Sequence, residues 1–148
     1  MAKTVAEIMN HELFAVRESD PSGETLGNLL SLGITSAPVV DAAGHPRGVV
    51  SLRDLWDAIP QDRVSTHMST PAAVVRSDAD IETAADTIAD TGFHHLVVTD
   101  DQGRAVGFVS TVDIIRGLRG KPVGHPSAFP HIDVDTGLAW SDDAVMVA

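Results

Sequence analysis

The sequence of 148 residues contains no cysteine, which excludes disulfide bonds and thiolate chemistry. Its longest apolar stretches have only the length of a β-strand, so we expect no membrane-spanning segment. The first residues, Met-Ala-Lys-Thr-Val-Ala-Glu, lack the apolar core of a signal peptide. Together these absences predict a cytoplasmic protein that does not bind a membrane. A hydrophobic content of 43% and a charged content of 21% are ordinary for one folded domain's worth of chain.

Positive charge is scarce. The chain has 10 Lys and Arg residues against 21 Asp and Glu residues, and its formal net charge is −11. Such a surface repels a phosphate backbone, so a DNA or RNA duplex is not expected as a partner. A small phosphorylated ligand held in one locally basic cleft remains compatible with this charge.

The common signatures of catalytic and metal sites are also missing. The chain has no Walker loop and no Rossmann fingerprint. His94 and His95 are neighbours on a predicted strand, so we expect their side chains to point to opposite faces and not to chelate one metal together. The other histidines show no metal-ligand spacing; they are His11, His45, His67, His125 and His131.

One segment is present twice, and the two copies align without a gap. GVVSLRD at residues 48–54 recurs 59 positions later as GFVSTVD at residues 107–113. The same offset pairs Met9 with Met68 and Gly33 with Gly92. Two copies are too few for a solenoid. The repeat therefore predicts two like units packed face to face about a pseudo-twofold axis, with paired clefts between them.

Each copy is predicted to fold as β-α-β-β-α. In the first copy the elements are expected at residues 14–16, 20–33, 37–40, 48–50 and 51–60, after a lead-in helix at 4–9 that begins with a capping box. In the second copy they are expected at 73–75, 80–90, 96–98, 106–109 and 111–118, with Gly92 ending the helix. The inward stripes of the two long helices are expected to consist of Leu26, Leu29, Leu30 and Leu32 and of Ile81, Ala84, Ala85, Ile88 and Ala89.

These elements predict an α/β (α+β) fold in which helices cover one face of each small sheet. We assign residues 1–60 to the first unit with its lead-in helix, residues 61–119 to the second, and residues 120–148 to a Pro/Gly-rich acidic extension. Within that extension, residues 132–135 alternate like an edge strand, and Trp140 and residues 145–147 are apolar. The extension is expected to be loosely attached, and either passive or in contact with a second subunit.

Ser51 and Ser110 each stand where a strand becomes a helix, with Asp54 and Asp113 three residues later. Unpaired N–H groups and the positive end of the helix dipole suit a phosphate at such a junction, and the serine hydroxyl adds a donor. The aspartate lies one helical turn on and can accept from two ribose hydroxyls. A nucleotide offers a diol and a phosphate at the required separation.

The same pattern also describes a helix cap. Ser-x-x-Asp at a helix start resembles a capping box, which contributes about 1 kcal/mol to stability. Cap and ligand site remain open alternatives at this point, and both can hold in the empty protein. The occurrence of the pattern twice in the same register favours a ligand site.

The ordered motifs resemble a pair of CBS domains, the tandem module first recognised in cystathionine β-synthase. The resemblance covers residues 4–118 and rests on the Met before each first strand, on APVVD at 37–41 with LVVTD at 96–100, and on the two Gly-x-x-Ser-x-x-Asp segments. It implies a flat two-domain disc whose clefts bind adenosine-containing ligands such as AMP, ADP, ATP or S-adenosylmethionine. It implies no catalytic cofactor and no metal.

The resemblance also implies which residues meet the ligand. Ser51 and Ser110 match positions that contact phosphate, and Asp54 and Asp113 match positions that hold the ribose. Around the base of one ligand it places Phe14, Ala15, Ser36, Ala37 and Pro38, and around the other it places Ala73, Val74, His95, Leu96 and Val97.

The two copies differ in their basic residues. His94 and His95 stand where related proteins often carry a basic pair near phosphate, whereas Thr35 and Ser36 stand there in the first copy. The histidines are either phosphate donors or polar residues at the entrance of a strand. Arg53 can reach a phosphate or extend into solvent. So few cations favour AMP or ADP over a tightly held triphosphate.

Three functions follow from these features. The first is a non-catalytic sensor, in which an adenosine ligand in the cleft changes the shape that an unknown regulated protein recognises. The second is a structural dimerisation module whose serines and aspartates are only caps. The third, an enzyme such as a nucleotide hydrolase, has little support because neither serine has a histidine placed to activate it. A homodimer is expected through the helices that carry Leu55, Trp56, Ile59, Ile114, Ile115 and Leu118.

Overall fold

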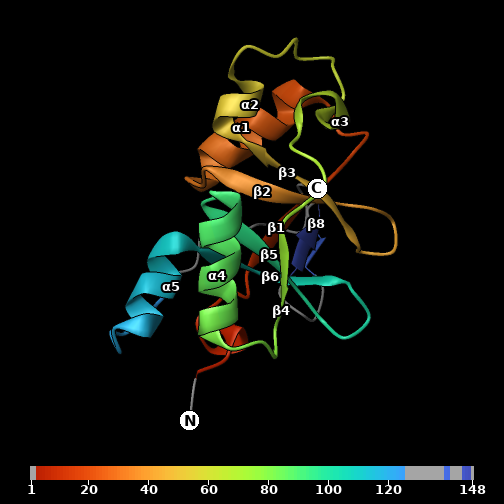
Figure 1. Ribbon diagram of the computed structural model, residues 1–148. Helices are drawn as coiled ribbons and strands as arrows, with labels where there is room; N and C mark the ends of the chain where they lie inside the picture. Colours follow the sequence, from red (N-terminus) through yellow and green to blue (C-terminus); the bar gives the residue numbers. More distant parts are fainter. Residues whose placement is uncertain (1–2, 126–138, 141–144, 148) are drawn as a thin grey trace.

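The computed structural model describes residues 3–125, 139–140 and 145–147. Its elements follow in the order η1 (Val5–Glu7), β1 (Leu13–Arg17), α1 (Ser22–Leu32), β2 (Ser36–Val40), β3 (Pro46–Ser51), α2 (Leu52–Trp56), α3 (Val64–His67), β4 (Val74–Arg76), α4 (Ile81–Thr91), β5 (His95–Thr99), β6 (Ala105–Ser110), α5 (Thr111–Leu118), β7 (Ala139–Trp140) and β8 (Val145–Val147). The first sheet has the strand order β3-β2-β1-β8-β7, and the second has the order β4-β5-β6. In Figure 1, α1 and α2 lie in the upper half of the molecule and α4 and α5 in the lower half. The α+β fold with two β-α-β-β-α repeats is confirmed.

The sequence offset of 59 recurs in the elements themselves. β2, β3 and α1 have the same lengths as β5, β6 and α4, and each begins 59 residues before its counterpart. Gly33 and Gly92 both end their helices in the left-handed conformation, with φ values of 67° and 72°. The two β-hairpins are closed alike, because Asp41 and Asp100 each accept two backbone N–H bonds across their turns.

The two repeats touch along their pseudo-twofold axis. The backbone N–H of Ala105 donates to the carbonyl oxygen of Gly44 at 2.9 Å, which joins the two hairpins. Ser36 and His95, which are equivalent positions 59 residues apart, approach to 3.4 Å between Oγ and Nδ1. The axis therefore passes between two equivalent side chains at the start of β2 and β5.

The lead-in segments cross over between the repeats. Val5, Ile8 and Met9 pack in the core of the second repeat, against a cluster formed by Val75, Ile81, Ala84, Leu96, Val98, Val109 and Ile114. Val64 and Met68 pack in the core of the first repeat, with Phe14, Val16, Leu29, Ala37, Val39, Val50 and Leu55. Each hydrophobic core is thus completed by the segment that precedes the other repeat's first strand, which ties the two repeats together.

A glycine in each motif makes this crossing possible. A Cβ on Gly48 would lie 2.5 Å from the carbonyl oxygen of Ser69, and one on Gly107 would overlap the sulfur of Met9. Glycine at these positions lets another backbone approach closely. They admit the lead-in segments, whose backbones form bridges between Asn10 and Phe108 and between Val49 and Ser69.

Several local expectations need correction. α2 ends at Trp56 and does not reach residue 59 or 60. Leu30 is 54% exposed and Ala89 is also exposed, so neither belongs to the inward stripe of its helix. Leu55 and Ile114 lie in the cores and are not part of an exposed helix face.

The C-terminal extension is attached more closely than the sequence suggested. β8 pairs in parallel with β1, with Leu13 opposite Val145, Phe14 opposite Met146 and Ala15 opposite Val147. β7 pairs antiparallel with β8. The expected edge strand at residues 132–135 lies outside the described residues. In the described part of the chain, no helix is long and apolar enough to cross a bilayer.

Candidate functional site

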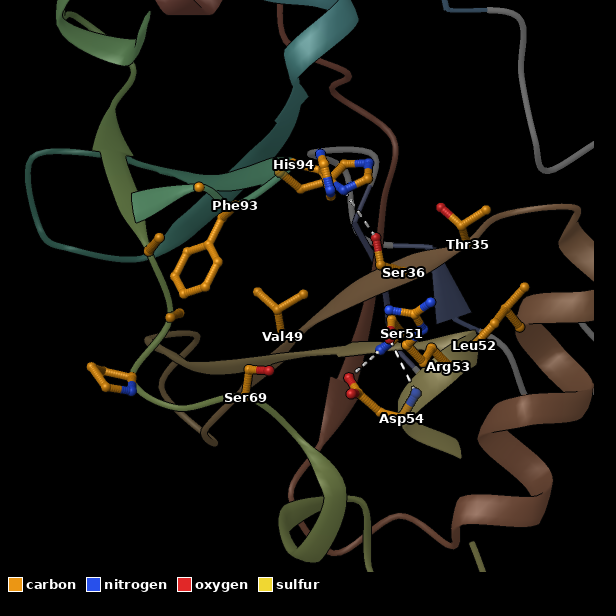
Figure 2. Close-up of a pocket in the computed structure, with 15 residues that line it drawn as sticks. Thr35, Ser36, Val49, Ser51, Leu52, Arg53, Asp54, Ser69, Phe93 and His94 are labelled. Atoms are coloured by element: carbon orange, nitrogen blue, oxygen red, sulfur yellow. Dashed lines mark hydrogen bonds between the residues drawn. The ribbon is translucent and has the colours of Figure 1, made fainter. Parts of the chain in front are cut away.

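A cavity of about 580 Å³, which we call the first pocket, lies between the two repeats. This volume falls within the range of roughly 300–1,000 Å³ that is usual for small-molecule sites. The first repeat supplies Thr35, Ser36, Val49, Ser51, Leu52, Arg53 and Asp54; the second repeat and the linker before it supply Ser69, Pro71, Ala72, Ala73, Gly92, Phe93, His94 and His95. Figure 2 shows Phe93 and His94 facing Ser51, Arg53 and Asp54 across this space.

Ser51 and Asp54 are held by a reciprocal capping box at the start of α2. The backbone N–H of Asp54 donates to Ser51 Oγ at 3.2 Å, and the backbone N–H of Ser51 donates to Asp54 Oδ2 at 2.9 Å. The serine hydroxyl acts here as an acceptor, so its proton is still available for a ligand. Asp54 Oδ1 takes no part in the cap. The cap therefore fixes both side chains at the pocket and leaves one donor and one carboxylate oxygen for binding.

An aromatic ring faces this wall, and basic side chains lie on both sides of the pocket. Phe93 is 45% exposed. Arg53 and His94 are exposed, and neither forms an ion pair with any carboxylate in the described part of the chain. An unpaired guanidinium beside a pocket offers a bidentate donor to a phosphate group.

His95 lies at the pseudo-twofold axis and contributes to both pockets. Its ring stacks on Phe108 with the centroids 4.9 Å apart. Burial lowers the pKa of His95 below its ordinary value of 6.5, and the charge of His94 adds to the shift while Asp113 opposes it. At neutral pH the imidazole is therefore uncharged and serves as a neutral hydrogen-bonding group.

A second pocket of about 250 Å³ is the pseudo-twofold equivalent of the first. Its lining consists of Asn10, Glu12, Leu13, Phe14, Gly33, Ile34, Thr35, Ser36, Pro38, His95, Phe108, Ser110, Asp113 and His125. Ser110 and Asp113 form the same capping box at the start of α5, with distances of 3.1 and 3.0 Å. This pocket has no Lys or Arg in its lining, and its volume is below the usual range for small-molecule sites.

The two pockets explain how the sequence-predicted residues group. Each pocket joins the Ser/Asp pair of one repeat to the strand entrance of the other: Ser51 and Asp54 face Ala73, and Ser110 and Asp113 face Phe14. His94 and His95 both line the first pocket, because β5 begins at His95 and His94 precedes the strand. The premise that both histidines lie on the strand is thus wrong, because only His95 belongs to β5.

Other predicted residues line neither pocket. Ala15, Ala37, Leu96 and Val97 are almost fully buried, and Val74 is exposed outside both cavities. Sequence reasoning missed Phe93 and Ser69 in the first pocket and His125 in the second. The repeat gave an indication of Ser69 and Phe93, because they occupy the positions equivalent to Asn10 and Ile34 at the offset of 59. His125 lies beyond the repeat and has no such counterpart.

Among the described residues, no group of three or more His, Cys, Asp or Glu side chains could hold a metal ion. The first pocket is a polar and aromatic cavity whose lining includes one carboxylate, one guanidinium and several hydroxyl groups. These groups can bind a polyhydroxylated, anionic and aromatic small molecule.

Comparison with known families agrees with this architecture. The family model described as "CBS domain" matches residues 5–59 and again residues 64–120. The two repeats, with their clefts between them, therefore form a tandem pair of the same domain. The chain belongs to the CBS domain family.

Individual relatives are larger or comparable in size. The magnesium transporter MgtE of Thermus thermophilus is 38% identical over 123 residues, which are 77% of this chain and only 26% of the transporter. The crystal structure of the cytosolic domain of the Mg²⁺ channel MgtE in complex with ATP has a TM-score of 0.67 at 39% identity, covering 72% of this chain and 45% of that chain. CBSX2 of Arabidopsis thaliana, solved in complex with AMP, has a TM-score of 0.70 at 26% identity, covering 79% of this chain and 96% of that chain.

Proposed function

We propose that the protein is a non-catalytic regulatory module that binds an adenosine nucleotide, preferably AMP or ADP, in the first pocket. The observation that carries this proposal is a cavity of about 580 Å³ in which Ser51, Asp54 and unpaired Arg53 of one repeat face Phe93 and Ala73 of the other. These groups match the parts of a nucleotide one by one.

Asp54 is the proposed ribose ligand, because its free carboxylate oxygen can accept from a sugar hydroxyl while the other oxygen keeps the cap. The Ser51 hydroxyl and the Arg53 guanidinium are the proposed phosphate donors. Phe93 and Ala73 offer apolar surface to the base, and an exposed aromatic ring stacks well on a purine. A single arginine suits one or two phosphates better than three.

Two solved relatives support the choice of ligand. The MgtE cytosolic domain, 39% identical, was crystallised with ATP, and CBSX2, 26% identical, was crystallised with AMP. The first pocket is lined by both repeats, so a ligand that contacts both walls favours one relative placement of the repeats over others. In our proposal a separate protein, still unknown, recognises that placement.

Titration calorimetry with AMP, ADP, ATP and S-adenosylmethionine tests the proposal. We expect heat of binding with AMP or ADP, and loss of that heat in Asp54→Ala and weakening in Ser51→Ala. Absence of heat with all four ligands, or undiminished binding in both variants, would refute it. A product assay with excess nucleotide tests the non-catalytic part, since any turnover that depends on Ser51 would contradict it.

A specific observation also favours a second candidate, a scaffold without a ligand. Both capping boxes are formed in full between groups of the chain itself, so stability alone is a sufficient reason for Ser51, Asp54, Ser110 and Asp113. In that case Asp54→Ala lowers the melting temperature, and no adenosine ligand raises the melting temperature of the wild type.

We further propose that two copies associate through the outer faces of α2 and α5. Trp56 is 68% exposed and Ile115, its equivalent 59 residues later, is 54% exposed. Ile59 and Leu118 form a second equivalent pair of exposed apolar side chains. Because the pseudo-twofold axis duplicates this apolar face, one twofold contact with another copy can cover both halves of it.

A further inference from the structure

The side chain of His125 faces the carboxylate that would hold a ligand in the second pocket. His125 Nε2 donates to the carbonyl oxygen of Ile8 at 3.0 Å and lies 3.5 Å from Asp113 Oδ1. Asp113 Oδ2 accepts from the backbone N–H of Ser110 at 3.0 Å. Asp113 is only 6% exposed, and the imidazole of His125 lies against its second oxygen, Oδ1, on the side of the pocket.

The chain that carries His125 is positioned by the second repeat. After α5 it turns at Gly120, which has a φ of 64°, and the N–H of Lys121 donates to the carbonyl oxygen of Arg116 at 2.8 Å. Val123 then packs against the core of the second repeat. His125 is thus placed at the pocket by contacts on the preceding residues and by its own bond to Ile8.

The extension also pairs with a strand that lines the second pocket. β8 pairs with β1 so that Val145 lies opposite Leu13 and Met146 opposite Phe14. Leu13 and Phe14 line this pocket, as His125 does. One described part of the extension therefore lines the cavity, and another pairs with a strand that lines it.

The first pocket shows no equivalent contact. The carboxylate of Asp54 has its capping bond and no imidazole against it in the described part of the chain. The first pocket is also the larger one, at about 580 Å³ against about 250 Å³. The two repeats supply equivalent Ser/Asp pairs, so the difference in access comes from outside the repeat.

We propose that the segment from Gly120 to His125 closes the second pocket through His125, so that His125 decides how many ligand molecules the chain binds. This inference depends on the proposed function for the identity of the ligand. A ligand that binds Asp113 must displace the imidazole of His125. The apparent affinity of that ligand is its intrinsic affinity multiplied by the fraction of chains in which His125 has moved away from Asp113. Coupling of this kind typically changes affinity by about 5- to 150-fold.

The test is the stoichiometry of AMP binding by titration calorimetry on the full chain. We expect one AMP per wild-type chain, two per His125→Ala chain, none per Asp54→Ala chain and one per Asp54→Ala/His125→Ala chain. His11→Ala is the matched control, because His11 is a nearby histidine outside both pockets, and it should keep a stoichiometry of one.

The outcomes separate this inference from the proposed function. One AMP in both wild type and His125→Ala, or two AMP already in wild type, overturns the role of His125 and leaves nucleotide binding in place. No AMP in any variant overturns both. The contact itself has a readout without ligand: Asp113→Asn should shift the ring nitrogen resonances of His125 in the NMR spectrum, and unchanged resonances would overturn the contact.

Discussion

Asp54→Asn separates ligand binding from helix capping. Asn keeps an oxygen that can accept the 2.9 Å bond from the backbone N–H of Ser51, so most of the cap survives. What the substitution removes is the negative charge and one carboxylate oxygen at the pocket. Stability and affinity should therefore respond very differently.

The expected loss of stability is small. A complete N-terminal cap contributes about 1 kcal/mol, and a charge in the first helical turn contributes about 0.3–1 kcal/mol. Since the acceptor remains, the free energy of unfolding should fall by less than about 1 kcal/mol. The loss of affinity should be larger, because a hydrogen bond to a charged group contributes about 1.5–3 kcal/mol. This corresponds to AMP binding that is about 10- to 150-fold weaker.

Calorimetric titration with AMP and urea denaturation on the same preparation measure both quantities. Asp57→Asn is the matched control, because Asp57 is an exposed carboxylate next to α2 that does not line the pocket. It removes the same charge and should change affinity little. If Asp54→Asn binds AMP as tightly as wild type, Asp54 is a cap only and the assignment of the ribose site fails.

Three further predictions concern pH, packing and assembly. The pKa of His95 is lowered in the folded chain. The free energy of unfolding should therefore keep its full His95 contribution above pH 6.5 and lose it as the pH falls below 6.5 toward the lowered pKa. His95→Gln should remove this part of the pH dependence from denaturation curves. Gly48→Ala should destabilise the protein by about 1–3 kcal/mol, because the new Cβ would lie 2.5 Å from the carbonyl oxygen of Ser69. Gly27→Ala is the control and should not destabilise, because its Cβ would have no atom within 4 Å. Equal urea midpoints of the two variants would contradict this prediction. Ile115→Asp should convert a dimer into a monomer in light scattering at micromolar concentration, and a wild-type monomer would refute the dimer.

The repeat made most of the fold predictable. Local signals determine where elements begin and end, such as Gly33 and Gly92 at helix ends and Asp41 and Asp100 in the hairpin turns. These signals depend on neighbouring residues, so they can be identified in a single sequence. The Ser/Asp pairs were found in the same way, because a capping box is also a local pattern.

Contacts between distant segments were not predictable. The exchange of lead-in segments places Val5 in one core and Val64 in the other, and nothing local indicates which repeat each segment joins. The resemblance to CBS domains placed Leu96 and Val97 around the base of a ligand, yet both are fully buried and pack in the interior. The contact of His125 with Asp113 depends on where the chain turns after Gly120.

The central claim is that a nucleotide lies between the two repeats, and its most direct test is to locate a bound nucleotide. A crystal grown with 8-bromo-AMP would give an anomalous bromine signal. The account predicts this signal in the first pocket, on the side of Phe93, with the ribose at Asp54. A signal at any other place on the protein, or none at saturating ligand, would contradict it.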